Sequence, residues 1–596
     1  DNVIRRARTL LNANASYRPF SWLSVAGDAN YDRGDYAQTS YTARGTPLVT
    51  STGGLSPSIG SLSESNQVTD GYIITGTVSA TKTVGELTAR LSQRGETRRE
   101  YSPSLTTSGT DFGTEGLKAM SQARVRTTSN SITDYRVLGA ITNLGLSFKE
   151  RYIGDFLWRR EGNSLFGAAN RWNTFGRASA AWILSEESWF PMPAFNQFKL
   201  RYSYGVTGVS PSFSDQYESM TNDGTGAIRR SNLGNVNITP TFTKEQEIGI
   251  DLAYKSRLSA TVTYVRNDSK DVFVNVPAPA VSGYQIVRTN PAYIGGNVLE
   301  VTLQGAVLTN PNGLRWDILV TGDNQQQFTR RFGRTCFDDG LQYKCDGIPL
   351  SEMWGNQNVR DKSQLAAIHR NSQAQFDVND EGWVVPVGAG NTWRDGIAKN
   401  LWGSSVTIDG TAYGWGLPIQ RRDSTGQLWY DRIGNSQPLF RFGFQNNFRY
   451  NNFRLFVQTT GQLGGDVYAN SNQTFYASGD HPDVDQFGKP DELKKPVAYY
   501  NAVSNNNNLY LAQFVESGTH LTIAELMLGY TADAKRWPFL DKVGVSRAQI
   551  DLIGRNMRTF TNYTGLNVMA GSPTVRFDDA TYPMTRTLTG VVTLTF

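Results

Sequence analysis

The chain has 596 residues, of which 39% are hydrophobic, 12% are aromatic and 19% are charged, and its formal net charge at pH 7 is +5. This charge is small for the length, and basic residues are interspersed with acidic ones, which argues against a nucleic-acid-binding protein. No run of 18 or more apolar residues occurs, so the sequence predicts no transmembrane helix. A membrane β-barrel is compatible with this composition, because barrel strands show only weak alternation of hydrophobicity.

Segments with a period of two follow one another along the whole chain. Apolar and polar residues alternate, for example, through FKLRYSYGVT at 198–207. About seventeen strands are predicted, namely 5–17, 21–31, 71–81, 85–95, 135–148, 152–160, 175–184, 198–207, 245–254, 257–265, 298–308, 313–322, two within 439–462, and then 519–530, 546–556 and 585–596. Turns or loops separate all of them.

The segment 439–462 shows the pattern most clearly, as a hairpin around a break at Tyr450-Asn451-Asn452. One face of the hairpin is aromatic and the other carries arginines and amides. One soluble core cannot absorb so many apolar faces, so the chain is predicted to be all-β, a large antiparallel transmembrane β-barrel. The residues expected to face the membrane are Phe440, Phe442, Phe444, Phe453 and Phe596.

Short turns alternate with long polar loops. Tight joins are predicted near Arg18-Pro19, Val84, Glu150, Lys255-Ser256, Pro311-Asn312 and Asn451. The longest loop, 329–437, is expected to be extracellular, and the tight turns and the C-terminus are expected to be periplasmic. Bacterial barrels have even strand numbers, so an odd count beginning near residue 5 predicts that upstream strands are missing from this chain. The whole of 1–596 is accordingly read as the C-terminal majority of a barrel.

The chain has only two cysteines, Cys336 and Cys345, in one polar stretch. A disulfide in an oxidising compartment is expected, because a zinc site would need more ligands than this neighbourhood offers. Only three histidines occur in the chain, which also weakens a metal-enzyme interpretation.

The loop 329–437 concentrates tryptophan, which stacks well on sugar rings. Ligand contact or docking of a lid protein is one interpretation, and packing of the loop itself is the other. The residues concerned are Trp354, Trp383, Trp393, Trp402, Trp415 and Trp429.

Asp377, Asn379, Asp380 and Glu381 lie beside Gly382 and faintly resemble a calcium loop, but the spacing of an EF-hand is absent. We therefore expect a solvated turn and no cofactor, with calcium as the alternative.

Arginines recur on the polar faces of the predicted strands. They could line an import path, whereas the simpler interpretation is that a wet lumen needs polar side chains held by salt bridges between strands. The residues expected to line the lumen are Arg201, Arg441, Arg449, Arg454 and Arg555.

No catalytic motif is recognised, since GxSxG, HExxH, Walker A and GxGxxG in the required strand-to-helix context are absent. Glu186 and Glu187 are adjacent, so their side chains diverge on an extended strand and cannot act as an acid/base pair. A non-enzymatic protein is expected.

Several segments resemble the SusC/RagA family of TonB-dependent outer-membrane transporters. YIGDFLWRREGNSLFG at 152–167 resembles a family strand that reads roughly Y-x-x-x-x-x-x-R-x-D/E-G-S-S-x-F-G, and FKLRYSYGVTG at 198–208 is similar to L-K-L-R-x-S-Y-G-x-T-G. Further similar segments are 245–252, IGNSQP at 433–438, LMLGY at 526–530 and RNMRTFTNYTGL at 555–566. They occur in the family's order over roughly 135–596, and the chain ends on phenylalanine.

The resemblance implies a 22-stranded barrel in the outer membrane of a Gram-negative bacterium, with a plug domain inside it. It also implies import of a large nutrient, either an oligosaccharide or a peptide, energised through TonB and assisted by a SusD-like surface lipoprotein that acts as a lid. The plug and the TonB box are not recognised in this chain, so they are expected upstream or in another chain. A passive porin or structural outer-membrane barrel is the first alternative, and a secreted all-β glycan-binding protein is the second.

Overall fold

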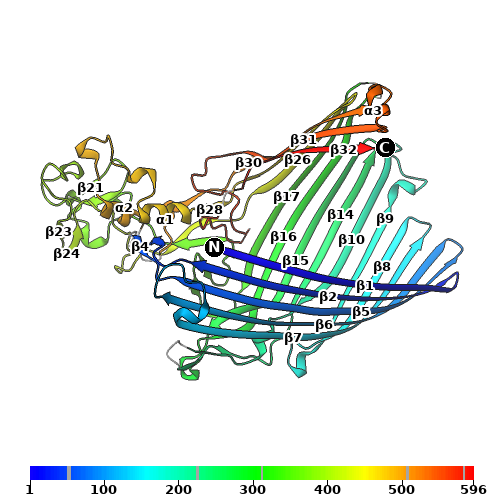
Figure 1. Ribbon diagram of the computed structural model, residues 1–596, viewed down its shortest axis with the longest axis horizontal. Coiled ribbons are helices and arrows are strands. Elements are labelled where there is room, and N and C mark those ends of the chain that lie inside the picture. Colours follow the sequence, from blue (N-terminus) through cyan, green and yellow to red (C-terminus); the bar gives the residue numbers. More distant parts are fainter. Residues whose placement is uncertain (50–54, 223–226, 311–312, 505–508, 573, 582–583) are drawn as a thin grey trace. The chain divides into compact units, whose positions relative to one another are not determined.

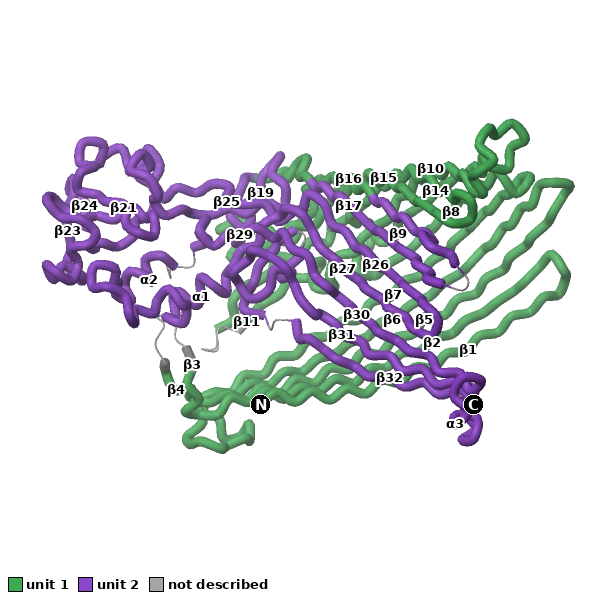
Figure 2. Tube along the Cα trace, turned by 90° about the horizontal axis from the view of Figure 1, so that it is seen from above, with its two compact units in different colours: residues 1–48, 55–299, 328–334 green, residues 49–54, 300–327, 335–596 purple. Residues whose placement is uncertain are grey.

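The computed structural model describes residues 1–49, 55–222, 227–310, 313–504, 509–572, 574–581 and 584–596. Two compact units are distinguished (Figure 2). Unit 1 comprises Asp1–Leu48, Leu55–Leu299 and Phe328–Arg334, and unit 2 comprises mainly Glu300–Gln327 and Thr335–Phe596. None of the helices in the described ranges is long and apolar enough to cross a membrane.

Long antiparallel strands make up most of unit 1, and many of them lie side by side in Figure 1. They are β1 (Asn2–Phe20), β2 (Leu23–Thr42), β5 (Ser61–Val84), β6 (Leu87–Phe112), β7 (Ala123–Phe148), β8 (Tyr152–Asn163), β9 (Trp172–Ile183), β10 (Phe195–Val209), β14 (Thr241–Tyr254) and β15 (Leu258–Pro277). Each of these strands except β1 is hydrogen-bonded to the one before it in this series. The strands β16 (Ile286–Thr309) and β17 (Arg315–Arg331) are divided between the units.

Unit 2 contains a second antiparallel series together with most of the irregular structure. Its long strands are β26 (Phe440–Tyr450), β27 (Phe453–Leu463), β30 (His520–Asp533), β31 (Arg547–Thr561) and β32 (Thr587–Thr595). They are paired in that order, and β26 also pairs with β17. The helices are α1 (Asn470–Ser478), α2 (Val497–Ser504) and α3 (Pro538–Lys542).

Short strands occupy the connections. In unit 1 they include β11 (Met220–Asn222), β12 (Ile228–Arg230) and β13 (Asn232–Leu233), and β3 (Pro47–Val49) and β4 (Leu55–Pro57) lie at the boundary of the units. In unit 2 they are β18 (Phe337–Asp339), β19 (Gln342–Lys344), β20 (Glu352–Gly355), β21 (Phe376–Val378), β22 (Val384–Pro386), β23 (Ser405–Ile408), β24 (Thr411–Gly414), β25 (Asp431–Asn435), β28 (Asp466–Tyr468) and β29 (Val515–Ser517).

The apolar face of the long strands carries exposed side chains and, among the residues that the structure describes, no core packs against it. Leu138 on β7 and Phe156 on β8 are 55% and 51% exposed, although both lie in the middle of paired strands. Some aromatic rings instead cover glycines of neighbouring strands, and Phe442 lies over its register partner Gly461 in this way. A soluble sandwich would bury such residues against a second sheet, so the face requires an apolar surrounding.

The tight turns lie close to the predicted positions, with one correction. Lys149-Glu150 and Lys255-Ser256 have positive φ at both residues, and they belong to the three-residue joins 149–151 and 255–257. At the first predicted turn, however, β1 continues through Arg18-Pro19 to Phe20, and the register shifts there. Proline lacks an N–H for the ladder, so it marks an irregularity in the strand and not the turn. The predicted turn at Pro311-Asn312 lies outside the described residues.

Candidate functional site

The polar face of unit 1 is crossed by ion pairs between strands that are adjacent or one strand apart. Arg159 Nη2 on β8 lies 3.4 Å from Glu96 on β6, and Arg177 on β9 pairs with Asp155 on β8 at 2.5 Å. Further along the sheet, Arg330 Nε lies 3.1 Å from Asp268 on β15. These pairs neutralise charges at mid-strand and leave the face polar.

Four of the five arginines predicted to line a lumen are paired in the same way. Arg201 contacts Glu247 and Asp251 on β14, within unit 1. In unit 2, the pairs are Arg441 with Asp323 at 2.6 Å, Arg454 with Asp551 at 2.7 Å, and Arg555 with Glu525 at 2.9 Å. Arg449 lies opposite Arg315 and Arg454 in the strand register, so three arginines adjoin at this level of unit 2.

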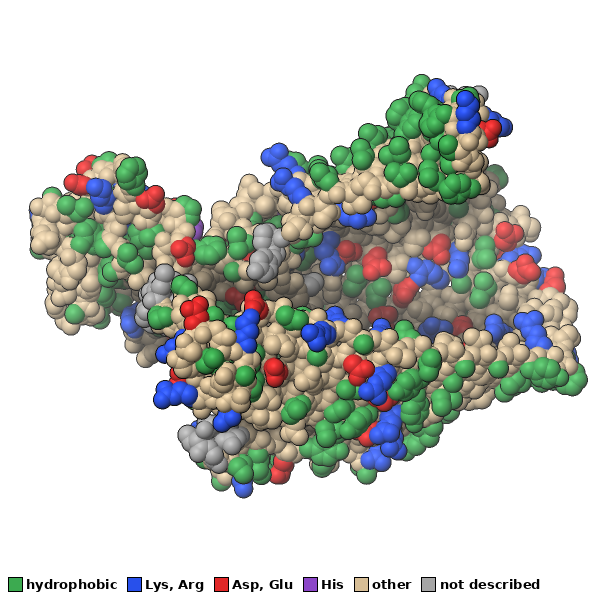
Figure 3. All heavy atoms as spheres, in the orientation of Figure 1, with side chains coloured by type: hydrophobic (Ala, Val, Ile, Leu, Met, Phe, Trp, Pro, Cys, Tyr) green, Lys and Arg blue, Asp and Glu red, His purple; other side chains and the backbone are tan. Residues whose placement is uncertain are grey.

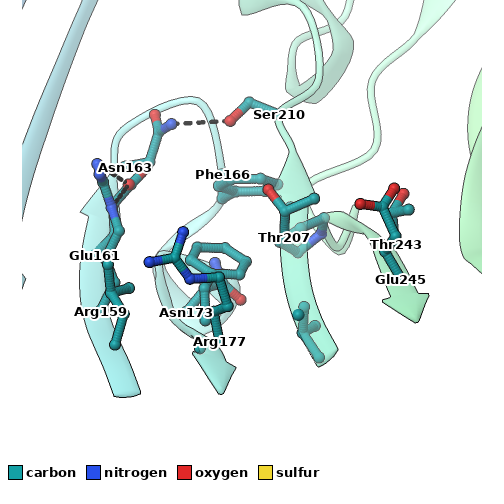
Figure 4. A pocket seen from close by; sticks show the side chains of 17 residues that line it. Arg159, Glu161, Asn163, Phe166, Asn173, Arg177, Thr207, Ser210, Thr243 and Glu245 are labelled. Carbon is teal, nitrogen blue, oxygen red and sulfur yellow. Dashed lines mark hydrogen bonds and ion pairs between the residues drawn. The ribbon is translucent and has the colours of Figure 1, made fainter. Parts of the chain in front are cut away.

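A cavity of about 490 Å³ lies on the polar face near the long connections 164–171 and 210–240 (Figure 4). Arg159 and Glu161 line it from β8, Arg177 from β9, Thr207 from β10 and Glu245 from β14. Between Arg177 and Glu245 in the register lies Gly205, which has no side chain, and this absence leaves room for the cavity. Arginines and carboxylates alternate around it, so it offers donors and acceptors to a polar ligand.

The predicted loop region forms only part of a compact substructure. We call its three segments, 335–437, 464–519 and 562–581, the lobe, and all three belong to unit 2. They share one hydrophobic core in which Met353, Tyr468, Tyr499 and Leu511 are buried and Phe577 packs against them. The boundary at 329 requires correction, because β17 continues to Arg331.

Most of the predicted tryptophans pack inside the lobe. Trp383 and Trp415 are buried in its core, and Trp393 and Trp402 pack against that core. Trp354 lies against Tyr343 and Tyr430 in a separate aromatic group, with the Trp354 and Tyr343 ring centroids 4.9 Å apart. The guanidinium of Arg421 covers Trp429. In this arrangement Trp383 and Trp415 stabilise the lobe, and the partly exposed tryptophans are those that can reach a ligand or partner.

A lysine holds two of the carboxylates of the calcium candidate. The ammonium of Lys495 lies 2.8 Å from Asp380 and 3.1 Å from Glu381. Asn379 is buried and donates to the hydroxyl of Tyr499, and Asp377 accepts from the backbone of Val378 and Trp393. Within the described part of the chain, no group of three or more histidine, cysteine or acidic side chains is arranged to hold a metal ion.

The structure joins Cys336 and Cys345 in the predicted disulfide. The bridge flanks the small hairpin of β18 and β19, whose outermost pair is Phe337 and Lys344.

Three residues that hold the lobe together were not identified from the sequence, namely Lys495, Tyr499 and Asp578. The apolar run at 496–503, PVAYYNAV, was the one available signal for a buried segment there.

Protonation of His481 at mildly acidic pH should lower the stability of the lobe. Its ring stacks on Tyr476, with centroids 4.0 Å apart, and its Nδ1 accepts from the Asp483 backbone, which requires a neutral imidazole. Burial lowers the pKa of His481, although Asp483 opposes the shift. The unfolded chain therefore takes up a proton first, and stability falls as the pH drops below about 6.5. His481→Gln should flatten this loss between pH 7 and 5, measured as hydrogen exchange of 470–485. An unchanged pH profile would contradict the assignment.

Comparison with known families gives one match over more than half of the chain. The family model described as TonB dependent receptor-like, beta-barrel matches residues 1–349. TonB-dependent receptor P39 of Formosa agariphila is 24% identical over 483 residues, which are 75% of this chain and 45% of that protein. TonB-dependent receptor SusC of Bacteroides thetaiotaomicron is 30% identical over 87 residues, 14% of this chain and 9% of that protein.

Solved structures agree with the sequence comparisons at the level of the fold. The structure of the RagAB peptide transporter superposes with a TM-score of 0.74 at 16% identity, covering all of this chain and 62% of the matched chain. This likeness shows the fold alone. The chain spans about half the length of the curated relatives it matches over most of its length.

Proposed function

We propose that this chain forms the barrel wall of an outer-membrane transporter, because it belongs to the TonB dependent receptor-like β-barrel family and resembles its SusC and RagA members. The transporter takes up a large nutrient, an oligosaccharide or a peptide, by a TonB-dependent process. It works with a SusD-like lipoprotein lid outside and with the TonB complex through a plug. The long loops and the lobe face the exterior, and the C-terminus faces the periplasm.

One observation carries this proposal: the two faces of the strands differ in chemistry. The apolar face is exposed and suited to lipid, whereas the opposite face pairs its charges across strands and contains the cavity. A barrel wall with these two faces can separate a water-filled passage from the surrounding lipid. The passage needs no catalytic group.

The cavity lining favours a peptide over an oligosaccharide. Its charged groups of both signs, Arg159, Arg177, Glu161 and Glu245, match the ammonium, carboxylate and amide groups of a peptide. Sugar sites commonly rely on exposed aromatic platforms, and here Phe166 is buried and Phe175 covers Gly208. The RagAB structure is that of a peptide transporter, which agrees with this choice.

Filling the cavity should reduce uptake without disturbing the barrel. Thr207 points into the cavity, so Thr207→Trp should lower peptide accumulation in cells by at least tenfold. Tyr204→Trp is the matched control, because it lies on the same strand but on the opposite face. Uptake by the unmodified protein should cease when a protonophore dissipates the proton gradient. Uptake that persists after that treatment would instead favour the passive porin, and equal uptake by the two variants would contradict the assignment of the cavity.

A further inference from the structure

The connection between β30 and β31 differs from the short turns of neighbouring strands. β26 and β27 are joined by Asn451-Asn452 alone, whereas residues 534–546 carry the helix α3. Leu540 and Val545 of this connection are buried. Trp537, Phe539 and Val543 point outward and are 42%, 58% and 65% exposed. A turn in bulk water gains nothing from presenting three large apolar side chains.

The outward side chains of α3 continue an apolar row that crosses five strands. In the register, Tyr450 lies opposite Phe453, Phe453 opposite Tyr530, Tyr530 opposite Ile550, and Ile550 opposite Val592. The indole N–H of Trp537 donates to the hydroxyl of Tyr530 at 3.2 Å, which links the turn to this row. The row lies on the apolar face, which meets lipid in a transmembrane barrel, so the apolar surface of α3 is continuous with the lipid-facing surface.

Basic side chains surround this apolar surface. Lys535, Arg536, Lys542 and Arg547 are all exposed, and the acidic residues of the same turn are Asp533 and Asp541. Asp533 pairs with Arg547 at 3.0 Å, so a positive surplus remains. Figure 3 shows hydrophobic side chains gathered over α3 and β30–β32, with lysine and arginine at the tip. Aromatic residues edged by basic ones are typical of segments that lie at a membrane surface.

We propose that the α3 turn, residues 534–546, is an interfacial anchor that lies in the headgroup layer of the leaflet nearest the short turns. Trp537, Phe539 and Val543 enter the boundary with the acyl chains, and the basic residues contact the phosphates of anionic phospholipids. This inference rests on the membrane placement proposed above. It goes beyond that placement, because an ordinary short turn would only emerge into water.

A depth measurement tests the anchor. Phe539→Cys is labelled with an environment-sensitive NBD group in the complete protein, and the protein is reconstituted in phosphatidylethanolamine vesicles containing phosphatidylglycerol. Within residues 1–596 both native cysteines are in the disulfide, so the introduced thiol is the reactive one in this part of the protein. Leu552→Cys, in the middle of β31 on the apolar face, and Phe487→Cys, exposed in the lobe, are the matched controls. Nitroxide lipids labelled near the headgroup should quench position 539, those labelled deep in the chain should quench 552, and neither should quench 487.

Each outcome has a distinct meaning. Quenching at 552 without quenching at 539 overturns the anchor and leaves the membrane placement standing. Absence of quenching at 552 overturns both. If the label at position 539 is shielded both from lipid quenchers and from aqueous iodide, a protein covers α3. This outcome also overturns the anchor. Lys535→Glu combined with Lys542→Glu should weaken the quenching at 539 at least twofold, and only in vesicles that contain phosphatidylglycerol. An equal effect in neutral vesicles would refute the role of anionic lipid.

Discussion

Replacing Lys495 by alanine should destabilise the lobe by about 3 kcal/mol, because it removes the cation from a buried ionic cluster. The Lys495 side chain is 4% exposed and its ammonium contacts both Asp380 and Glu381. Tyr499 donates to Glu381 at 2.9 Å, so the cluster reaches the core of the lobe. Without the lysine, the two carboxylates lie close together with no ammonium between them. Their partial exposure keeps the expected loss at the lower end for a broken buried pair.

Hydrogen exchange gives the most direct measurement of this effect. Amides of β22 and α2 should exchange about a hundredfold faster in Lys495→Ala, since 1.4 kcal/mol corresponds to a factor of ten in an opening equilibrium. Lys494→Ala is the control, because the Lys494 side chain is partly exposed and, among the residues that the structure describes, its ion pair is with Asp491 in its own turn. Strands β30 and β31 should keep their protection in both variants. Equal exchange of the lobe in the two variants would show that the cluster does not stabilise it.

Replacing Asp578 by alanine should detach the last segment of the lobe, at a cost of about 4 kcal/mol. The Asp578 side chain is fully buried, and its Oδ2 accepts from the hydroxyls of Ser471 and Tyr563 at 2.9 Å. The same oxygen accepts from the backbone N–H groups of Leu566 and Asn567 at 2.8 and 3.1 Å. Alanine would leave four donors without an acceptor in a dry site, and each unpaired donor costs about 1–3 kcal/mol.

A graded pair of variants separates this role from simple loss of charge. Asp578→Asn keeps one acceptor oxygen and should cost about half as much as alanine. Asp579→Ala removes the neighbouring exposed acid, whose carboxylate accepts from the Asn470 side chain, and should leave the segment attached. Limited proteolysis between 562 and 581 provides the measurement. Cleavage of Asp579→Ala as fast as Asp578→Ala would refute the role of Asp578.

The predicted all-β barrel fold and the family resemblance are confirmed. The fold could be predicted because a strand with one face toward lipid and one toward water alternates apolar and polar residues along its own sequence. Each predicted strand overlaps a strand of the structure, since alternation is visible wherever one face is apolar. The predicted lengths were too short at several strands, among them β2, β5, β6, β7, β15 and β16. Residues 102–112 of β6 consist mainly of serine and threonine, so this part of the strand shows no apolar period.

The lobe was predictable only where its contacts are local. The cysteines are nine positions apart, so their pairing could be inferred from proximity. Lys495 and Asp380, by contrast, are 115 positions apart, and no local pattern relates them. The tryptophans were recognised as a group, but their burial depends on Tyr468, Tyr499 and Leu511 from another segment. A deletion of 329–437 would therefore expose half of that core, and point variants are better tests of the lobe.

The assembly of one core from three segments has a consequence for biogenesis. Gln342 donates to the carbonyl of Thr574, 232 positions later, and Tyr468 stacks on Phe577. A polypeptide leaving the ribosome and the export channel in order cannot finish this core until nearly all of its C-terminal residues have been delivered. Until then, the apolar surfaces of the first two segments are exposed, and export chaperones must shield them for most of the time that secretion takes.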